Sequence, residues 1–191
     1  MSIDAHDTPA GFVAEWRDIF TPAELDKIEA YGDALSPAKA EIAGRTDNVD
    51  HLRITRVAWM DRGPQTEWLY ARIENAVLEL NSRLYKYDLY GLVESFQYTV
   101  YESAVRGHYD WHVDTGATEP RKISLTLQLS EPSAYEGGDL MLQTGVGSPV
   151  PAQKARGTLV AFPSYMMHRV MPVTAGTRKS MVVWVAGPPF R

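Results

Sequence analysis

Apolar side chains recur every three or four residues in two segments of the N-terminal half, the spacing of an amphipathic helix. The first segment, 22–31, follows Thr21, which can cap a helix, and contains Glu24, which completes a capping box. We expect this helix to end near Gly32, because glycine commonly terminates helices. The second segment spans 66–84 and has apolar residues at Trp68, Leu69, Ile73, Ala76, Val77, Leu80 and Leu84.

From residue 94 onward, short apolar or alternating stretches are separated by turns that contain glycine and proline, a pattern typical of β-strands. Helices followed by a run of strands indicate an α+β fold with a sandwich, jelly-roll or closed-barrel core. We expect a single domain over 1–191, with the core at about 94–186, N-terminal helices that buttress it and a flexible tail at 1–11. The predicted strands are 52–60, 94–102, 108–114, 121–130, 138–143, 157–162, 167–173 and 178–186.

Composition narrows the classes of function. The chain has 191 residues, of which 45% are hydrophobic and 23% charged, and its formal net charge is −5. No basic run could follow a phosphate backbone, so nucleic-acid binding is not indicated. No stretch reaches the ~18 apolar residues of a membrane span, and residues 1–11 lack the apolar segment of a secretory signal. The absence of cysteine excludes thiolate metal sites and cysteine nucleophiles. We expect a soluble, cytoplasmic protein.

One stretch, Gly-His-Tyr-Asp-Trp-His-Val-Asp at 107–114, concentrates metal-binding side chains. His112 and Asp114 stand two positions apart, and side chains at that spacing leave the same face of a strand. His168 follows His112 by 56 residues. Two imidazoles and one carboxylate with open coordination positions suit a non-haem Fe(II) oxygenase. His108 lacks a carboxylate at the required spacing, so we exclude it. A His-x-Asp pair alone is also common on surface strands.

The pattern that decides between these interpretations lies downstream. His168 is followed by Pro172-Val173, by Gly176 and, ten positions after the histidine, by Arg178. This register resembles the distal half of the Fe(II)/2-oxoglutarate-dependent dioxygenases, in particular the prolyl 4-hydroxylase-like superfamily. The predicted strands before it also resemble that family, so that the resemblance covers about 95–186. It implies a double-stranded β-helix, or jelly-roll, core.

The resemblance implies a role for each residue of the pattern. His112, Asp114 and His168 would bind Fe(II) and leave positions open for 2-oxoglutarate and O2. Arg178 would hold the distal carboxylate of 2-oxoglutarate, because a guanidinium can offer a carboxylate two parallel hydrogen bonds. Tyr101 and Gln128 stand where relatives place groups that contact the cosubstrate. Ser180, two residues after Arg178, would share its strand face and can donate a further hydrogen bond to the cosubstrate.

Two features near this pattern have two interpretations each. Ser124, Thr126 and Gln128 alternate along one face of a predicted strand, and such a polar row fits a ligand cavity and solvent equally well. Tyr109 and Trp111 could line a substrate entry or pack in the core, which is the commoner place for aromatic rings. The sequence leaves both questions open.

The activity implied is hydroxylation of an unactivated C–H bond, coupled to oxidative decarboxylation of 2-oxoglutarate to succinate and CO2, with ascorbate as a supporting reductant. The family analogy gives the substrate as a prolyl or lysyl residue of a protein, a free amino acid or a small metabolite. The segments 36–50 and 61–66 are candidate lids over the entry. The arginines that could engage a carboxylate-bearing substrate are Arg53, Arg56, Arg62 and Arg169.

Two other classes of protein stay open at this point. A cupin-like metal dioxygenase would use the three metal ligands without 2-oxoglutarate and would not need Arg178 at its register. A non-catalytic jelly-roll binding module would carry the three residues incidentally. Formation of succinate from 2-oxoglutarate, and its loss when His112 is replaced, would separate these classes from the first.

Overall fold

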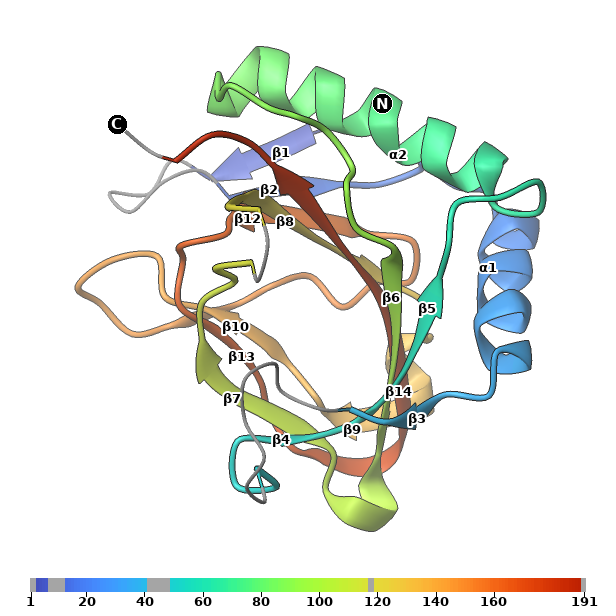
Figure 1. Cartoon of the computed structure of the whole chain (residues 1–191). Helices are drawn as coiled ribbons and strands as arrows, with labels where there is room; N and C mark the ends of the chain where they lie inside the picture. Colours follow the sequence, from blue (N-terminus) through green and yellow to red (C-terminus); the bar gives the residue numbers. More distant parts are fainter. Residues whose placement is uncertain (1–2, 7–12, 41–48, 117–118, 190–191) are drawn as a thin grey trace.

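The computed structural model describes residues 3–6, 13–40, 49–116 and 119–189 (Figure 1). The helices are α1 (Pro22–Ala34) and α2 (Glu67–Leu80), with short helical turns at Asn81–Tyr85, Ser103–Val105 and Pro132–Ala134. The strands are β1 (Ile3–His6), β2 (Val13–Trp16), β3 (Ala38–Lys39), β4 (Arg53–Ile54), β5 (Arg56–Met60), β6 (Phe96–Glu102), β7 (His108–His112), β8 (Arg121–Gln128), β9 (Tyr135–Gly137), β10 (Leu140–Leu142), β11 (Val150–Pro151), β12 (Leu159–Pro163), β13 (His168–Val170) and β14 (Val173–Ala186).

Two antiparallel sheets form the core. The larger sheet has the order β1-β2-β12-β8-β14-β6-β5-β3, with β9 paired to β14, and the smaller has the order β11-β10-β13-β7-β4. Both helices lie on the outer side of the larger sheet, away from the smaller one (Figure 1). This arrangement confirms the predicted α+β class and the jelly-roll core.

Strand β12 shows how alternating side chains divide the interior into two layers. Leu159 and Ala161 belong to the cluster that packs the larger sheet against the helices. Val160 and Phe162, on the opposite face of the strand, belong to a second cluster that includes Leu140 of the smaller sheet. Because side chains alternate along a strand, each central strand of the larger sheet serves both layers. The second layer is the one that encloses the candidate site.

Helix α1 begins as predicted and ends later than predicted. The Thr21 hydroxyl accepts a hydrogen bond from the Glu24 amide, and the Glu24 carboxylate accepts one from the Thr21 amide, which completes the capping box. The helix does not end at Gly32 but continues to Ala34. A Cβ at Gly32 would lie 2.5 Å from ring atoms of Tyr98, so this glycine allows the helix to approach the sheet closely.

The second predicted helix is confirmed over α2, but its last turn differs. Residues Asn81–Tyr85 form a π-helical turn that stops at Lys86, whose φ is 54°. The Asn81 side chain donates to the Tyr87 carbonyl and accepts from the Tyr87 amide, both at 2.9 Å. These two hydrogen bonds fix the backbone of Tyr87 just after the helix ends.

The prediction of a flexible tail at 1–11 is wrong for Ile3–His6, which form β1 and pair with β2. Strand β2 in turn pairs with the edge of β12. The rest of the predicted tail lies outside the described residues. A four-residue strand of this kind depends on a sheet edge from the far end of the chain, so local sequence signals it weakly.

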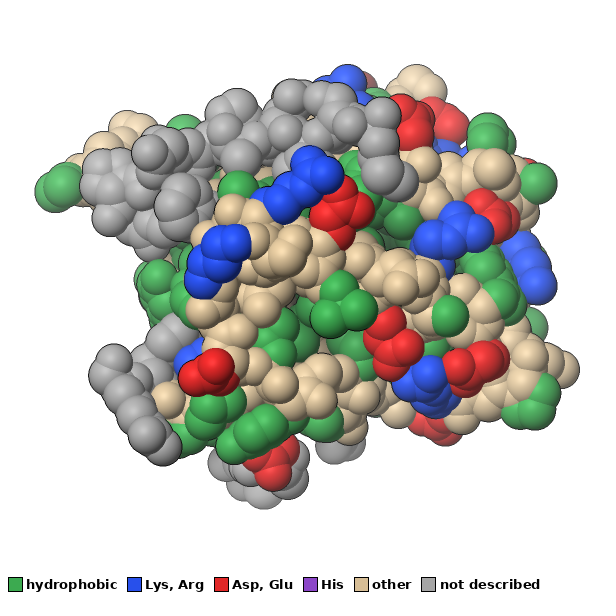
Figure 2. Space-filling view, turned by 90° about the horizontal axis from the view of Figure 1, so that it is seen from above, with side chains coloured by type: hydrophobic (Ala, Val, Ile, Leu, Met, Phe, Trp, Pro, Cys, Tyr) green, Lys and Arg blue, Asp and Glu red, His purple; other side chains and the backbone are tan. Residues whose placement is uncertain are grey.

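The surface carries charges of both signs. On the face drawn in Figure 2, basic and acidic side chains are interspersed rather than gathered into one patch. Arg62, for example, forms ion pairs of 2.6 Å with both Glu67 and Glu74. Among the described residues, none of the helices has the length and apolar character needed to cross a membrane.

Candidate active site

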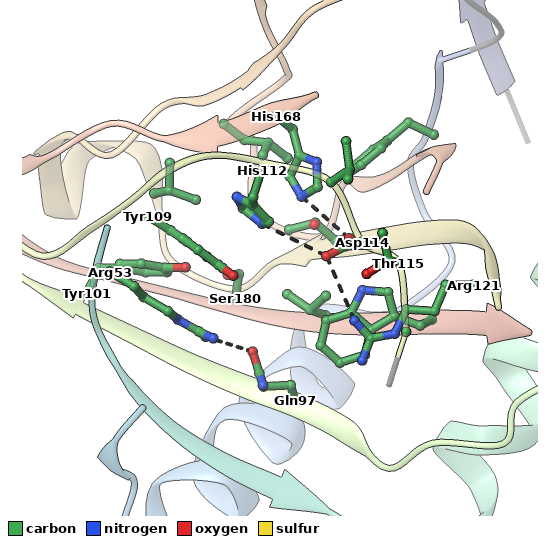
Figure 3. A pocket seen from close by; sticks show the side chains of 18 of the residues that line it. Arg53, Gln97, Tyr101, Tyr109, His112, Asp114, Thr115, Arg121, His168 and Ser180 are labelled. Carbon is green, nitrogen blue, oxygen red and sulfur yellow. Dashed lines mark hydrogen bonds and ion pairs between the residues drawn. The ribbon is translucent and has the colours of Figure 1, made fainter. Parts of the chain in front are cut away.

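The smaller sheet brings the three predicted metal ligands together. His112 in β7 lies directly opposite His168 in β13. Strand β7 ends at His112, and Asp114 is fixed just beyond it by a 2.9 Å hydrogen bond from its amide to the Ser164 carbonyl. One ligand atom from each of the three side chains lies within 4.8 Å of the other two (Figure 3). These distances leave room for a shared metal ion.

Backbone carbonyls fix which nitrogen of each imidazole faces this point. Nδ1 of His112 lies 2.7 Å from the Asp110 carbonyl, and Nδ1 of His168 lies 2.9 Å from the Met166 carbonyl. Because a carbonyl only accepts, both Nδ1 atoms carry hydrogens, and Nε2 keeps its lone pair in the neutral ring. The Nε2 atoms lie 3.9 Å (His112) and 3.4 Å (His168) from the Asp114 carboxylate. Burial, and to a lesser degree His168, lower the pKa of His112 to about 4, so it is neutral at neutral pH.

Asp114 is held as a carboxylate. Burial acts to raise the pKa of Asp114, but the neighbouring imidazoles and a 2.7 Å hydrogen bond from the Ser124 hydroxyl outweigh it, so that the pKa lies below its ordinary value. The Ser124 and Ser164 hydroxyls are 2.9 Å apart. Since Ser124 donates its proton to Asp114, Ser164 must donate to Ser124. This series of hydrogen bonds orients the Asp114 carboxylate toward the two imidazoles.

The three residues line a cavity of about 520 Å³, within the usual range for small-molecule pockets. Arg178 of β14 lines the same cavity and is only 1% exposed. Its guanidinium donates to the Gln128 side-chain oxygen at 2.9 Å and to the Ser180 hydroxyl at 3.2 Å, while Nε has no partner. No carboxylate of the described residues forms an ion pair with it. A buried cation without a counter-ion is costly, so the site suits an anionic ligand.

The other predicted cosubstrate contacts surround Arg178. Tyr101 lies opposite Arg178 in the β6–β14 pairing, and its ring centroid is 5.4 Å from the guanidinium carbon. Tyr101 and Ser180 both line the cavity. Gln128 contacts Arg178 but is not among the lining residues, so it acts on the cavity by positioning the guanidinium. The chemistry and the volume of the site therefore fit Fe(II) and a small dicarboxylate.

Comparisons with known proteins agree with this geometry. A family model described as the 2OG-Fe(II) oxygenase superfamily matches residues 96–186. A PKHD-type hydroxylase of Rippkaea orientalis is 30% identical over 175 residues, which cover 88% of this chain and 75% of the relative. The chain belongs to the 2OG-Fe(II) oxygenase superfamily. It is thus an enzyme, a dioxygenase of the hydroxylase type that uses Fe(II) and 2-oxoglutarate, and the cupin-like and non-catalytic alternatives are not favoured.

A further relative supports the family of this oxygenase, and solved structures support its fold. A PKHD-type hydroxylase of Xanthomonas campestris is 30% identical over 178 residues, with the same coverage of 88% and 75%. A prolyl-4-hydroxylase of Pseudomonas putida has a similar fold, with a TM-score of 0.72, 21% identity and 93% of each chain covered. A Trichoplax adhaerens prolyl hydroxylase, solved with a hypoxia inducible factor peptide, gives a TM-score of 0.75 at 19% identity, with 94% of this chain and 84% of that chain covered.

The structure of the oxygenase resolves both questions that the sequence left open. The polar row faces inward: Thr126 lines the cavity, Ser124 contacts Asp114 and Gln128 contacts Arg178. Tyr109 also lines the cavity, with its ring centroid 3.6 Å from that of His112. Trp111 does not line the cavity. Its ring packs against Arg169, whose guanidinium carbon lies 4.7 Å from the Trp111 ring centroid.

Of the four arginines considered for substrate binding, only Arg53 lines the cavity of the oxygenase. Arg56 pairs with Glu102 at 2.9 Å, and Arg62 pairs with surface carboxylates. No described residue of the two candidate lid segments, 36–50 and 61–66, lines the cavity, so a lid at 61–66 is not supported; residues 41–48 lie outside the described part of the chain.

Several residues that line the cavity of the oxygenase were not predicted from the sequence. Gln97 shares its strand face with Tyr101, and Trp184 shares its face with Ser180, so strand parity could have found both. Trp59 joins them from β5, with its ring centroid 6.2 Å from that of Trp184. Arg121 also lines the cavity. It pairs with Glu94, and its guanidinium carbon lies 3.6 Å from the Trp184 ring centroid.

Proposed function

We propose that His112, Asp114 and His168 bind Fe(II), and that Arg178 binds the distal carboxylate of 2-oxoglutarate in the same cavity. The reaction consumes one substrate C–H bond, one 2-oxoglutarate and one O2, and yields the hydroxylated substrate, succinate and CO2. One oxygen atom of O2 enters the alcohol and the other enters succinate, so the atoms balance. When bound, the metal and the cosubstrate supply the oxidising chemistry.

The observation that carries this proposal is the buried guanidinium of Arg178, which has no carboxylate partner among the described residues and lines the cavity of the three ligands. Gln128 and Ser180 orient it by accepting hydrogen bonds, and because both acceptors are uncharged, the positive charge stays available to an anion. Tyr101 closes one side of this position. A dicarboxylate that reaches both Arg178 and the metal would be held at two ends, which fixes its orientation.

The residues around the metal position have further roles in this proposal. Ser124 holds the Asp114 carboxylate, and the Asp110 and Met166 carbonyls hold the two imidazoles. Phe162 and Leu140 supply an apolar wall that limits the access of water. Exclusion of water protects reactive species from side reactions.

The substrate is proposed within the class that the family suggests. The PKHD-type relatives are named hydroxylases, and two of the solved neighbours are named prolyl hydroxylases, one of them with a peptide. We infer that the substrate is a prolyl or lysyl residue of a protein, a free amino acid or a related small metabolite. Ascorbate is expected to support turnover by keeping the iron reduced. A cytoplasmic location stays a prediction.

Succinate formation tests the proposal. The protein is incubated with Fe(II), 2-oxoglutarate and ascorbate, without a primary substrate, and succinate is measured. We expect slow uncoupled turnover that disappears in His112→Ala and weakens sharply in Arg178→Ala. His108→Ala is the matched control, because His108 stands on the same strand but its ring contacts the Arg106 carbonyl instead. Turnover that survives in His112→Ala would refute the assignment.

A further inference from the structure

A second buried guanidinium lines the same cavity. Arg53 is 7% exposed, and its Nε atom has no hydrogen-bond partner. Its only side-chain hydrogen bond among the described residues runs from a terminal nitrogen to the Gln97 side-chain oxygen at 2.9 Å (Figure 3). No carboxylate of the described residues pairs with it. Arg121, in contrast, lines the cavity but is neutralised by Glu94 at 2.7 Å.

Two neighbours place the Arg53 cation beside the metal position. Arg53 lies opposite Tyr109 in the β4–β7 pairing, and its guanidinium carbon is 4.5 Å from the Tyr109 ring centroid. The other face of the tyrosine stacks on His112, with ring centroids 3.6 Å apart. The ring and the Gln97 amide are neutral, so they orient the guanidinium without cancelling its charge. Burial of such a charge is costly unless an anion joins it.

The Arg53 position is separate from the position of Arg178. On the cavity floor, Tyr101 pairs with Arg178, Thr99 with Ser180, and Gln97 with Val182. Gln97 therefore stands four residues from Tyr101 along β6. At the rise of a strand, the backbone positions of these two residues are about 13 Å apart. Since Gln97 holds Arg53 at its end of the floor and Gln128 and Ser180 hold Arg178 at the other, one small anion at Arg178 leaves Arg53 without a partner.

The cavity also opens to solvent close to Gln97, the hydrogen-bond partner of Arg53. Trp59, which lies opposite Gln97 in the β5–β6 pairing, is 46% exposed and lines the cavity. The Trp184 ring lies beside the Trp59 ring, with centroids 6.2 Å apart and an angle of 42° between the ring planes. A ligand that enters past these two rings reaches Arg53, which Gln97 holds, and also Asp114, which lies beside Trp184. This is the expected place of the primary substrate rather than of the cosubstrate.

From these contacts we propose that Arg53 and Gln97 bind a carboxylate of the primary substrate, so that the substrate is a small free carboxylic acid of the amino-acid class. The proposal rests on the proposed function and names the substrate class of the same site. Arg53 can offer Nε–H and a terminal N–H to a carboxylate, and the Gln97 amide nitrogen can donate a further hydrogen bond. An internal residue of a peptide has no free main-chain carboxylate to place at a side chain so deeply buried.

Thermal stability with a panel of ligands tests this proposal. The protein is loaded with Mn(II), as an inert substitute for Fe(II), and with 2-oxoglutarate, and the melting temperature is recorded. The standard L-amino acids are then added at millimolar excess, each beside its own carboxamide, together with short peptides blocked at both ends. A ligand that binds the folded state raises the melting temperature by mass action. We expect at least one free acid to give an additional rise that its carboxamide does not give.

Variants assign this rise to Arg53. Arg53→Gln should weaken the affinity for that acid by at least about thirtyfold, because a buried charge pair loses one partner, and should leave the 2-oxoglutarate rise intact. Gln97→Leu, which keeps the arginine but removes its support, should weaken the same affinity and serves if Arg53→Gln does not fold. Arg56→Gln is the matched control, since Arg56 is exposed and pairs with Glu102 outside the cavity.

Each other outcome overturns the proposal. If Arg53→Gln abolishes the 2-oxoglutarate rise, Arg53 serves the cosubstrate. If carboxamides or blocked peptides bind as well as the free acids, no substrate carboxylate is recognised at Arg53. If no acid of the panel adds to the rise, the substrate class is wrong. A wild-type protein that shows no rise with Mn(II) and 2-oxoglutarate would instead refute the proposed function, so the two failures are distinguishable.

Discussion

Replacement of Arg178 by methionine separates a ligand-binding role of this residue from a structural one. Methionine keeps much of the length of the buried side chain but removes its charge and its hydrogen bonds. In the ligand-free protein the variant leaves the Gln128 oxygen without its 2.9 Å donor, which costs about 1–3 kcal/mol. It also removes the cost of burying a guanidinium that has no carboxylate partner among the described residues. We expect these two effects to offset each other, so that the free energy of unfolding changes by less than about 2 kcal/mol.

The effect of Arg178→Met on 2-oxoglutarate binding should be far larger. Loss of one partner of a buried charge pair costs about 2–5 kcal/mol, which corresponds to a roughly 30- to 5,000-fold weaker affinity. Calorimetric titration of the Mn(II)-loaded protein with 2-oxoglutarate measures this change. Lys179→Met is the control, because Lys179 is adjacent on β14 but pairs with Glu29 and Asp33 of α1. An affinity within a few-fold of wild type in Arg178→Met, or a stability loss alone, would refute the reasoning.

Three further predictions concern the site and its support. Ser124→Ala removes the 2.7 Å hydrogen bond to Asp114 and should weaken metal binding by about 10- to 100-fold in a calorimetric titration, whereas unchanged affinity would contradict the role given to this hydroxyl. Gly32→Ala places a Cβ 2.5 Å from the Tyr98 ring and should destabilise the protein by about 1–3 kcal/mol in urea unfolding; a neutral result would mean that α1 can shift freely. The pKa of His112 is lowered from 6.5 to about 4 in the folded protein, so between these pH values the unfolded chain binds the proton that the folded chain does not. The metal-free protein should therefore lose stability as the pH falls from 6.5 to 4, and His112→Gln should flatten this dependence in unfolding curves.

Residues that follow a fixed spacing along the chain could be predicted from the sequence alone. His112, Asp114, His168 and Arg178 stand at fixed intervals on predicted strands, and the family resemblance relates these intervals to roles. The structure brings all four to one cavity. Elements with strong local signals were predicted equally well, as in α1, where Thr21-Pro-Ala-Glu starts the helix by short-range hydrogen bonds.

What the sequence could not decide depends on contacts between distant segments. The polar row at Ser124 faces the cavity because the opposite face, with Leu125 and Leu127, is covered by the helices, and strand periodicity does not reveal which face is covered. The sequence did not distinguish Arg53 from the three other candidate arginines. The pairing of β4 with β7, which places Arg53 opposite Tyr109, does distinguish it. The pairing of β2 with β12 joins strands from opposite ends of the chain, and no local pattern specifies it.

A metal ion bound by the side chains of His112, Asp114 and His168 is central to the proposed activity. Anaerobic calorimetric titration with Fe(II) measures the number of ions bound per chain and their affinity. We predict one ion per chain in the wild-type protein and in His108→Ala, and no measurable binding at the same concentrations in His168→Ala. Undiminished Fe(II) binding by a folded His168→Ala variant would contradict the account.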